Sequence, residues 1–202
     1  MRILAVAPIA FLSAVACADR LIDIPTASKV LYDDFRYEFR ADPQTGGGFE
    51  NYLGLGVGKS FELDLRDVEV PGYKQVGTFD FAYDYIAAIP DTSPGISFGV
   101  QDAANTTPDG RRFYAVTTFR DQVDVIGGGS DLYLSLGMQV GRLTSPFVGV
   151  SMPFSKQVLF VAEHSGYRLS AGFEVRSMRS VALRIVERGS TPLLSLSASG
   201  RF

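Results

Sequence analysis

The stretch that decides the fold class is TPLLSLSASGRF, residues 191–202. Successive side chains of a β-strand point to opposite faces, so residues two apart share a face. One face of this segment carries Leu194, Leu196, Ala198 and Phe202, and the other carries Ser195, Ser197, Ser199 and Arg201. The segment therefore predicts a strand with one apolar face and one polar face, ending on an aromatic residue.

The same alternation recurs along the chain in segments of about ten residues, separated by Gly, Pro, Asp, Asn and Ser. Almost no helical periodicity lies between them. We predict strands near 29–40, 47–58, 60–70, 73–88, 94–103, 111–121, 131–141, 146–152, 155–163, 166–176, 179–188 and 192–202. The count is about twelve, with ten as the alternative. In the strand at 155–163 both faces are apolar, which departs from the pattern.

Alternation alone does not separate a soluble β-sandwich from a transmembrane barrel, because both have one apolar and one polar face. Phe202 favours the barrel, since it resembles the C-terminal aromatic signal for insertion of bacterial outer-membrane barrels. Small residues on the polar face suit a crowded lumen and would weaken exposed strands. They are Gly54, Gly56, Gly58, Gly99, Gly137, Gly172 and Ser170.

The tyrosines allow two interpretations. Most fall towards the predicted strand ends, where a membrane barrel has its aromatic girdles. Ordinary strand preference explains them equally well. They are Tyr32, Tyr37, Tyr52, Tyr73, Tyr83, Tyr85, Tyr114, Tyr133 and Tyr167.

Together these features predict an all-β fold, a single antiparallel up-and-down transmembrane β-barrel. Charged side chains on the polar faces would then line one lumen. They are Arg36, Glu38, Glu62, Asp64, Arg66, Arg112, Arg120, Arg168, Glu174, Arg176, Arg184 and Arg201. Buried ions need partners or water, so these charges would either pair and fill the lumen or leave a narrow channel. We favour a mostly filled lumen.

The first eighteen residues predict a signal peptide. Arg2 precedes an apolar run at 3–16, and Ala16-Cys17-Ala18 is a small-x-small cleavage site. The expected organisation is a signal peptide at 1–18 and a barrel domain at 19–202. A lipoprotein that keeps Cys17 is the alternative, although Ala14 stands where a lipobox usually has leucine.

The composition excludes several classes of function. The formal net charge is -3 and the charges are scattered, which is unlike the clustered basic face of a nucleic-acid-binding protein. Cys17 is the only cysteine, so a disulfide framework or a thiolate metal site is not expected. We expect no cofactor and no metal.

Catalytic residues are also not expected. His164 is the only histidine and lies in Glu163-His164-Ser165-Gly166. Adjacent residues of a strand point to opposite faces, so Ser165 or Glu163 would not easily hydrogen-bond to His164. The glycine clusters at 46–48 and 127–129 lack the lysine and helix of a phosphate loop and predict turns.

Five segments resemble the YjbH-type outer-membrane barrels: IPTA at 24–27, VLY at 30–32, FRYEF at 35–39, PGISFGV at 94–100 and LFVAEHSGY at 159–167. The resemblance implies a barrel in the outer membrane and an association with exopolysaccharide export. Known members are several times longer than this chain. The family offers no catalytic motif to transfer.

The expected function is therefore a bacterial outer-membrane β-barrel, structural or forming a narrow pore, with a link to exopolysaccharide export. The expected partners are outer-membrane lipids, the barrel-insertion machinery through the C-terminal strand, and envelope proteins of polysaccharide export. Two alternatives remain: a small outer-membrane enzyme that uses His164, and a soluble, secreted, calycin-like protein that binds a lipophilic ligand in an apolar interior.

Overall fold

A computed structural model describes residues 20–28, 30, 32–43, 48–69, 75–178 and 180–202. The described residues form twelve strands. These are β1 (Asp34–Ala41), β2 (Phe49–Val57), β3 (Phe61–Val68), β4 (Val76–Ile86), β5 (Gly95–Gln101), β6 (Arg112–Val125), β7 (Gly128–Gly141), β8 (Ser145–Pro153), β9 (Val158–His164), β10 (Leu169–Met178), β11 (Val181–Arg188) and β12 (Thr191–Arg201). In this part of the chain, no helix is long and apolar enough to cross a membrane.

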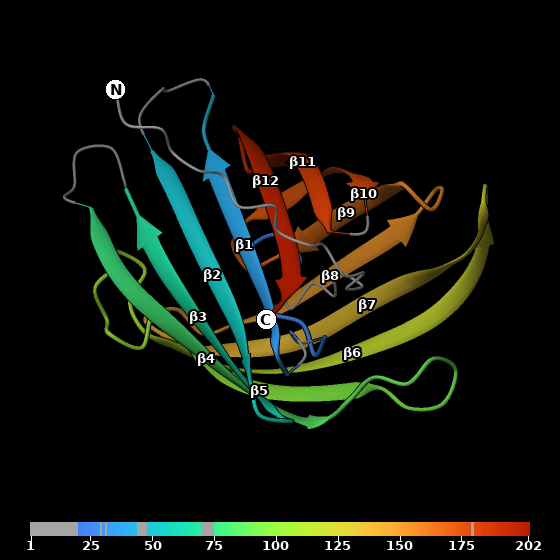
Figure 1. Cartoon of the computed structure of the whole chain (residues 1–202). Coiled ribbons are helices and arrows are strands. Elements are labelled where there is room, and N and C mark those ends of the chain that lie inside the picture. Colours follow the sequence, from blue (N-terminus) through green and yellow to red (C-terminus); the bar gives the residue numbers. More distant parts are fainter. Residues whose placement is uncertain (1–19, 29, 31, 44–47, 70–74, 179) are drawn as a thin grey trace.

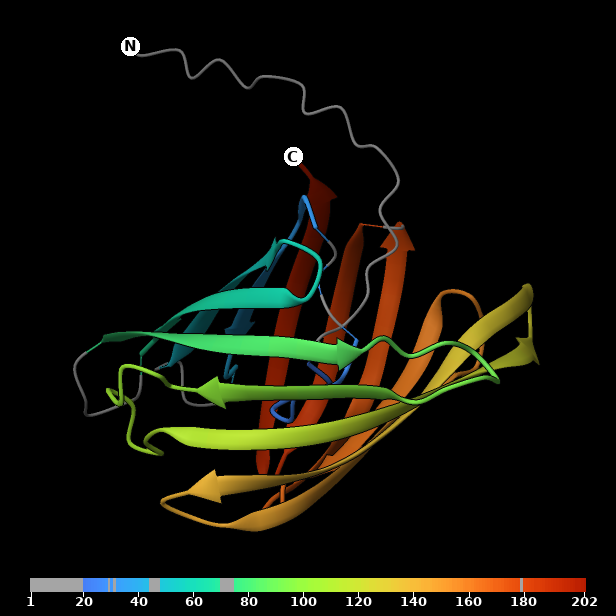
Figure 2. The same cartoon turned by 90° about the horizontal axis from the view of Figure 1, so that it is seen from below.

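The strands close into one barrel. Each strand pairs antiparallel with its neighbours in sequence, and β1 pairs with β12 from Asp34 opposite Arg201 to Ala41 opposite Leu194. Figures 1 and 2 show this ring from two directions. A closed barrel has no free edge strand, so every strand has two hydrogen-bonded neighbours. The predicted antiparallel up-and-down barrel is confirmed.

The boundaries of some strands differ from the prediction. The first strand was expected at 29–40, but β1 begins at Asp34, directly after Asp33, whose φ of 66° is outside the β region. β6 and β7 reach Val125 and Gly128, beyond the expected 121 and 131. The glycines Gly128 and Gly129 therefore lie within a strand, and the turn is confined to two residues, where Gly127 has a φ of 97°.

The outer wall is apolar. Large hydrophobic side chains that alternate along the strands are substantially exposed, and they come from all parts of the ring. Examples are Phe39, Val57, Leu65, Phe79, Phe98, Phe119, Leu136, Val148, Phe173, Leu183 and Leu196. Phe61 stacks on Phe81 and Tyr83, with ring centroids 5.4 and 5.0 Å apart, so part of this wall is continuous aromatic surface.

The inner wall is largely polar. Buried inward-facing residues include Arg36, Glu38, Arg40, Glu62, Asp64, Thr78, Asp80, Asp84, Ser97, Gln101, Thr118, Ser135, Gln139, Glu163, Glu174, Arg184 and Ser195. A calycin has an apolar interior and a polar exterior. This barrel has the opposite arrangement, which argues against the calycin alternative.

An N-terminal segment, described over residues 20–28 and 30, lies in the middle of the lumen. We call it the plug. Figures 1 and 2 show its blue trace within the ring of strands. Leu21, Ile22, Ile24 and Ala27 are almost completely buried. They form an apolar cluster with inward-facing residues of the wall, namely Val116, Phe147, Val161, Val186 and Leu193, against which Tyr114 also packs.

The plug accounts for the unusual pattern of β9. Leu159 and Val161 face inward on this strand and are each 2% exposed, so its second apolar face lies inside the barrel. Gly149 on the neighbouring β8 faces the plug as well. A Cβ atom there would lie 2.5 Å from Leu21 and 2.6 Å from Ile24, so a larger residue would require the ends of these side chains to move.

Candidate functional site

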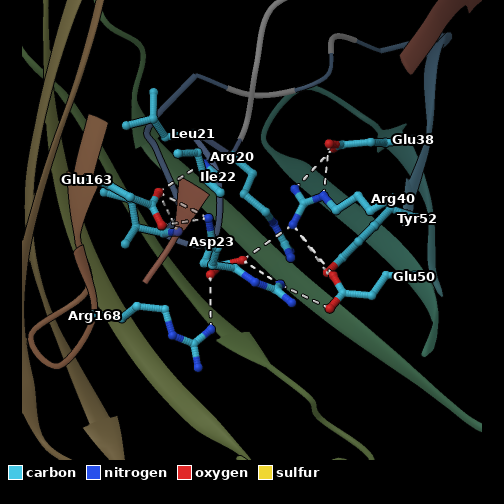
Figure 3. A network of polar contacts seen from close by, with 12 residues as sticks. Arg20, Leu21, Ile22, Asp23, Glu38, Arg40, Glu50, Tyr52, Glu163 and Arg168 are labelled. Atoms are coloured by element: carbon cyan, nitrogen blue, oxygen red, sulfur yellow. Dashed lines mark hydrogen bonds and ion pairs between the residues drawn. The ribbon is translucent and has the colours of Figure 1, made fainter. Parts of the chain in front are cut away.

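The tip of the plug is a tight turn that binds a carboxylate. The backbone N–H of Leu21 donates to the carbonyl of Ile24 at 3.1 Å, and the turn directs three further amides at Glu163. The amides of Ile22, Asp23 and Ile24 donate to the Glu163 carboxylate over 2.9–3.2 Å (Figure 3). Such a group of converging amides is a favourable anion site. Glu163 therefore anchors the tip to β9.

Other side chains of the wall bond to three further backbone groups of the plug. Arg184 donates to the carbonyl of Leu21. The hydroxyl of Thr118 accepts from the amide of Ala27 at 2.8 Å, and Glu62 accepts from the amide of Val30 at 3.0 Å. A buried backbone group without a partner is costly. These bonds therefore make burial of a non-helical segment in the lumen tolerable.

Arg20 joins the plug to the acidic side of the lumen. Its guanidinium lies 2.6 Å from Asp80 and 3.4 Å from Asp64, and Arg66 also contacts Asp80 at 3.3 Å. Burial disfavours the charged form of Arg20, but attraction to Asp80 and Asp64 outweighs this and places the pKa of Arg20 well above its ordinary value. The plug thus contributes a cation where the wall supplies carboxylates.

Tyr52 on β2 is the centre of a group of arginines. The guanidinium groups of Arg40, Arg20 and Arg66 lie 4.4, 4.9 and 5.1 Å from the centroid of its ring. Cations are attracted to the face of an aromatic ring. The Tyr52 hydroxyl donates to Glu50 at 2.6 Å. One residue thereby links the acidic side of the lumen to the charges around Asp23.

Asp23, at the tip of the plug, faces three arginines. Its carboxylate oxygens lie 3.4 Å from Arg40, 3.5 Å from Arg188 and 3.7 Å from Arg168. Glu50 shares two of these arginines, at 3.1 Å from Arg188 and 3.7 Å from Arg40. Figure 3 shows Asp23 between Arg40 on one side and Arg168 on the other. We call Asp23 and its three arginines the mouth cluster.

A second network crosses the wall next to the mouth cluster. Arg40 forms two hydrogen bonds with Glu38, at 2.9 and 3.2 Å. Arg184 contacts Glu174 at 2.6 Å and Glu38 at 3.7 Å, and Arg176 contacts Glu174 at 2.7 Å. Opposite charges on the same strand, on the neighbouring strands β10 and β11, and on β1 and β11 are therefore paired within the barrel.

The charged residues selected from the sequence fall into two groups. Buried inside the barrel are Arg36, Glu38, Glu62, Asp64, Glu174 and Arg184, with Arg66 nearly so. The remainder are partly exposed, and most lie near the rims. Arg112 donates to the Tyr167 hydroxyl at 2.7 Å, Arg120 pairs with Asp131 at 2.8 Å, and Arg201 pairs with Asp34 at 3.0 Å. Arg168 belongs to the mouth cluster and Arg176 to the second network.

The tyrosines do not form one girdle. Tyr32, Tyr37, Tyr83, Tyr85 and Tyr167 are exposed, but Tyr52 is buried in the lumen and Tyr114 packs against the buried plug cluster. Tyr133 lies beside Asp131, with its hydroxyl 3.3 Å from the carboxylate. Tyr73 lies outside the described residues. The selected glycine Gly58 is in a turn with a φ of 63°, not on the polar face of a strand.

His164 ends β9 and is exposed, whereas Ser165 is buried. The His164 Nδ1 accepts from the Gly166 amide at 3.1 Å, and the Ser165 hydroxyl donates to the carbonyl of Arg168 at 3.3 Å. These partners hold a turn. They do not bring the imidazole and the hydroxyl together. Among the described residues, no group of three or more His, Cys, Asp or Glu side chains is arranged to hold a metal ion.

One cavity beside the plug is small. A cavity lined by Arg20, Glu62, Asp64, Asp84 and Tyr114, among others, offers about 10 Å³ to the centre of a water molecule. That is room for about one water. At this position the lumen is filled, by the plug together with paired charges.

The segment 20–30 was not recognised as a separate element from the sequence. The signal that could have revealed it is the set of apolar residues at inward positions, such as Phe147, Val161 and Leu193. A water-filled lumen gives such residues nothing to pack against. The predicted signal peptide at 1–18, including Cys17, lies outside the described residues.

Comparisons with known proteins give little further information. No family model matches the chain. No curated protein matches it. Among solved structures, the Acinetobacter baumannii outer membrane protein Omp33 is similar with a TM-score of 0.48 and 11% sequence identity, over 86% of this chain and 100% of that chain.

Proposed function

We propose that this protein is a β-barrel of the bacterial outer membrane whose lumen is closed by its own N-terminal segment. The observation that carries the proposal is the inverted distribution of side chains. An apolar wall such as that of Leu65, Leu136 and Leu196 is exposed around a closed ring, and charged residues are buried inside it. This arrangement is stable in lipid for two reasons. The backbone groups of a closed ring are all paired, and the acyl chains cover the apolar outer wall.

In water the same surface would be a liability. Soluble monomers rarely expose a contiguous apolar patch larger than a few hundred Å². Here, exposed aromatic and aliphatic residues occur on strands all round the barrel, for example Phe98 on β5 and Phe173 on β10. A lipid environment is the simplest partner for this surface.

The C-terminal strand supports the proposed route of insertion. Phe202 follows β12 and is 79% exposed, with its ring 5.4 Å from that of Phe35. Its amide donates to the carbonyl of Asp33 at 2.8 Å, so the terminus is fixed at the seam between β1 and β12. An exposed terminal aromatic residue on the closing strand is accessible to an insertion machinery.

The filled lumen favours a structural or closed barrel over an open pore. Passage of a polysaccharide through the lumen would require the plug to leave, and this would expose Ile22 and Ile24 together with their apolar partners. The YjbH-type resemblance adds a proposed association with exopolysaccharide export. In our proposal, the closed barrel serves such an apparatus as an envelope partner.

Heat modifiability tests the proposal. The detergent-solubilised protein should migrate differently on a gel before and after boiling, because a closed hydrogen-bonded barrel resists detergent until it is heated. In cells, the protein should be found with outer membranes. Deletion of Phe202 should reduce its abundance there. A soluble periplasmic protein with one gel mobility would contradict the proposal.

A further inference from the structure

The mouth cluster has the composition of a binding site for an anion. Arg40, Arg168 and Arg188 come from three separated parts of the chain and converge on one carboxylate, that of Asp23. Guanidinium groups bind carboxylates through fixed, planar sets of donors. Asp23 is therefore a carboxylate ligand that the protein itself supplies.

Asp23 does not fill this site well. Charge-assisted N–H···O bonds are usually about 2.7–2.9 Å long. The distances from Asp23 to the three arginines are 3.4, 3.5 and 3.7 Å, and none of the three pairs is a close two-point contact. A free anion with more oxygen atoms than one aspartate could approach all three guanidinium groups more closely.

The site is accessible from one end of the barrel. Arg188 is the last residue of β11 and Arg168 directly precedes β10, so both lie at the end opposite Phe202. The side chains of Arg168, Asp23 and Arg188 are 40%, 24% and 21% exposed, whereas that of Arg40 is 1% exposed. Arg40 is therefore the buried member of the cluster, and Arg168 is its most exposed arginine.

Withdrawal of the plug is not needed to open this site. The apolar side chains of Ile22 and Ile24 and the amides bound to Glu163 hold the backbone of the tip. The carboxylate of Asp23 is free of those contacts and can rotate towards water. Glu50 remains on Arg188 and Arg40, so an incoming anion would be bound mainly between Arg168 and Arg188.

We propose that the end of the barrel opposite Phe202 binds small organic dicarboxylates between Arg168 and Arg188 over Arg40, and that Asp23 occupies this site when no ligand is bound. The inference rests on the proposed function, because it takes the barrel to be closed by a plug that remains in the lumen. A tethered competitor has a high effective concentration, so Asp23 lowers the apparent affinity for a free ligand.

Calorimetric titration of the refolded, detergent-solubilised protein with succinate tests this inference at low ionic strength. The neutral analogue succinamide is the control ligand. We expect saturable binding of succinate, with an affinity about tenfold higher in Asp23→Asn and in Asp23→Ala, because the competing charge is gone. The double variant Arg168→Gln/Arg188→Gln should lose at least about tenfold in affinity.

The matched control is Arg142→Gln, which changes an exposed arginine that bonds to the carbonyl of Pro108 outside the cluster. It should bind succinate as the wild type does. Equal affinity in the wild type, both Asp23 variants and the double variant would overturn the inference, as would equal binding of succinamide. Each variant is first checked for heat-modifiable mobility. A wild-type protein whose gel mobility does not change on boiling would contradict the proposed function. A heat-modifiable barrel that does not bind succinate selectively would contradict only the dicarboxylate site.

Discussion

The two sides of the lumen differ, although the outer wall is similar all round. Strands β1 to β4 direct charged residues inward, such as Glu38, Arg40, Glu62 and Asp80. Strands β6, β8 and β9 also direct large apolar residues inward, namely Val116, Phe147, Leu159 and Val161. The plug contacts both kinds of residue. Its Arg20 and Asp23 pair with charges of the wall, and its Leu21, Ile22 and Ile24 pack against the apolar residues.

This difference shows that the two faces of a barrel strand follow different rules. The outer face has one environment, so its composition is uniform around the ring. The inner face is matched to whatever fills the lumen, and here that is one short segment with both polar and apolar residues. The apolar side of the lumen is therefore a small protein core, and it should be sensitive to loss of the plug.

Deletion of residues 20–28 is expected to have the largest effect. The deletion removes the buried side chains of Leu21, Ile22 and Ile24. Burial of each contributes about 1.5–3 kcal/mol to the free energy of unfolding. The free energy of unfolding should therefore fall by about 5 kcal/mol or more. Urea titration of the protein refolded into bilayers measures this. Ser28→Ala, at the half-buried end of the segment, is the control and should change little. An unchanged midpoint after the deletion would mean that the plug is not part of the core.

The closed barrel could be predicted from the sequence because alternation is a local property. Each strand carries its own pattern, as in the stretch from Leu194 to Phe202, and turns between strands have their own residue types. Closure then follows from pairing of neighbours, which needs no long-range information beyond the first and last strands.

The plug could not be predicted in the same way. Its contacts join residues far apart in the sequence, such as Ile22 with Glu163 and Leu21 with Arg184. No local pattern distinguishes residues 20–30 from the start of a strand. The alternation in the sequence shows which charged residues lie on the polar face of each strand. Their partners, however, depend on which strands face each other across the lumen. The role of Asp23 in the mouth cluster belongs to this second class of information.

The second prediction tests the uniformity of the outer wall. Leu65→Lys on β3 and Leu136→Lys on β7 change exposed side chains of the outer wall on two separate parts of the ring. Each substitution should cost about 2–4 kcal/mol in a bilayer if the side chain faces mid-membrane lipid. Leu143→Lys, in the connection between β7 and β8, is the matched control and should cost little. Bilayer unfolding titrations that leave both strand variants as stable as the wild type would argue against lipid contact.

The third prediction concerns the single carboxylate that anchors the tip of the plug. Glu163→Ala would leave the buried amide groups of Ile22 and Ile24 without their acceptor. We expect a loss of about 1–3 kcal/mol in the free energy of unfolding, since an unsatisfied buried donor costs its desolvation. Glu163→Gln keeps one acceptor oxygen and should lose less. Glu187→Ala, an exposed residue on β11, serves as the control. Equal stability of the alanine variant and the wild type would show that the amides find water instead.

The smallest effect is expected at the start of the connection between β5 and β6, where Asp102 holds the loop. Asp102 accepts hydrogen bonds from the hydroxyls of Thr78 at 2.6 Å and Thr107 at 2.7 Å, and from the amides of Thr106 and Thr107 at 2.9 Å. Burial disfavours its charged form, but these bonds outweigh that effect and lower the pKa of Asp102 from 3.8 to about 2.

A carboxyl group whose pKa is lower in the folded state contributes stability above its unfolded pKa and loses that contribution as the pH falls through its folded pKa. Asp102→Asn should therefore be less stable than the wild type by about 1 kcal/mol at pH 6, because an amide replaces the accepting carboxylate. The difference should shrink between about pH 4 and pH 2, as the wild-type carboxyl becomes protonated. Asp109→Asn, an exposed residue of the same connection, is the matched control. Unfolding titrations at a series of pH values measure both variants, and a difference that stays constant down to pH 2 would mean that ionisation of Asp102 does not stabilise the loop.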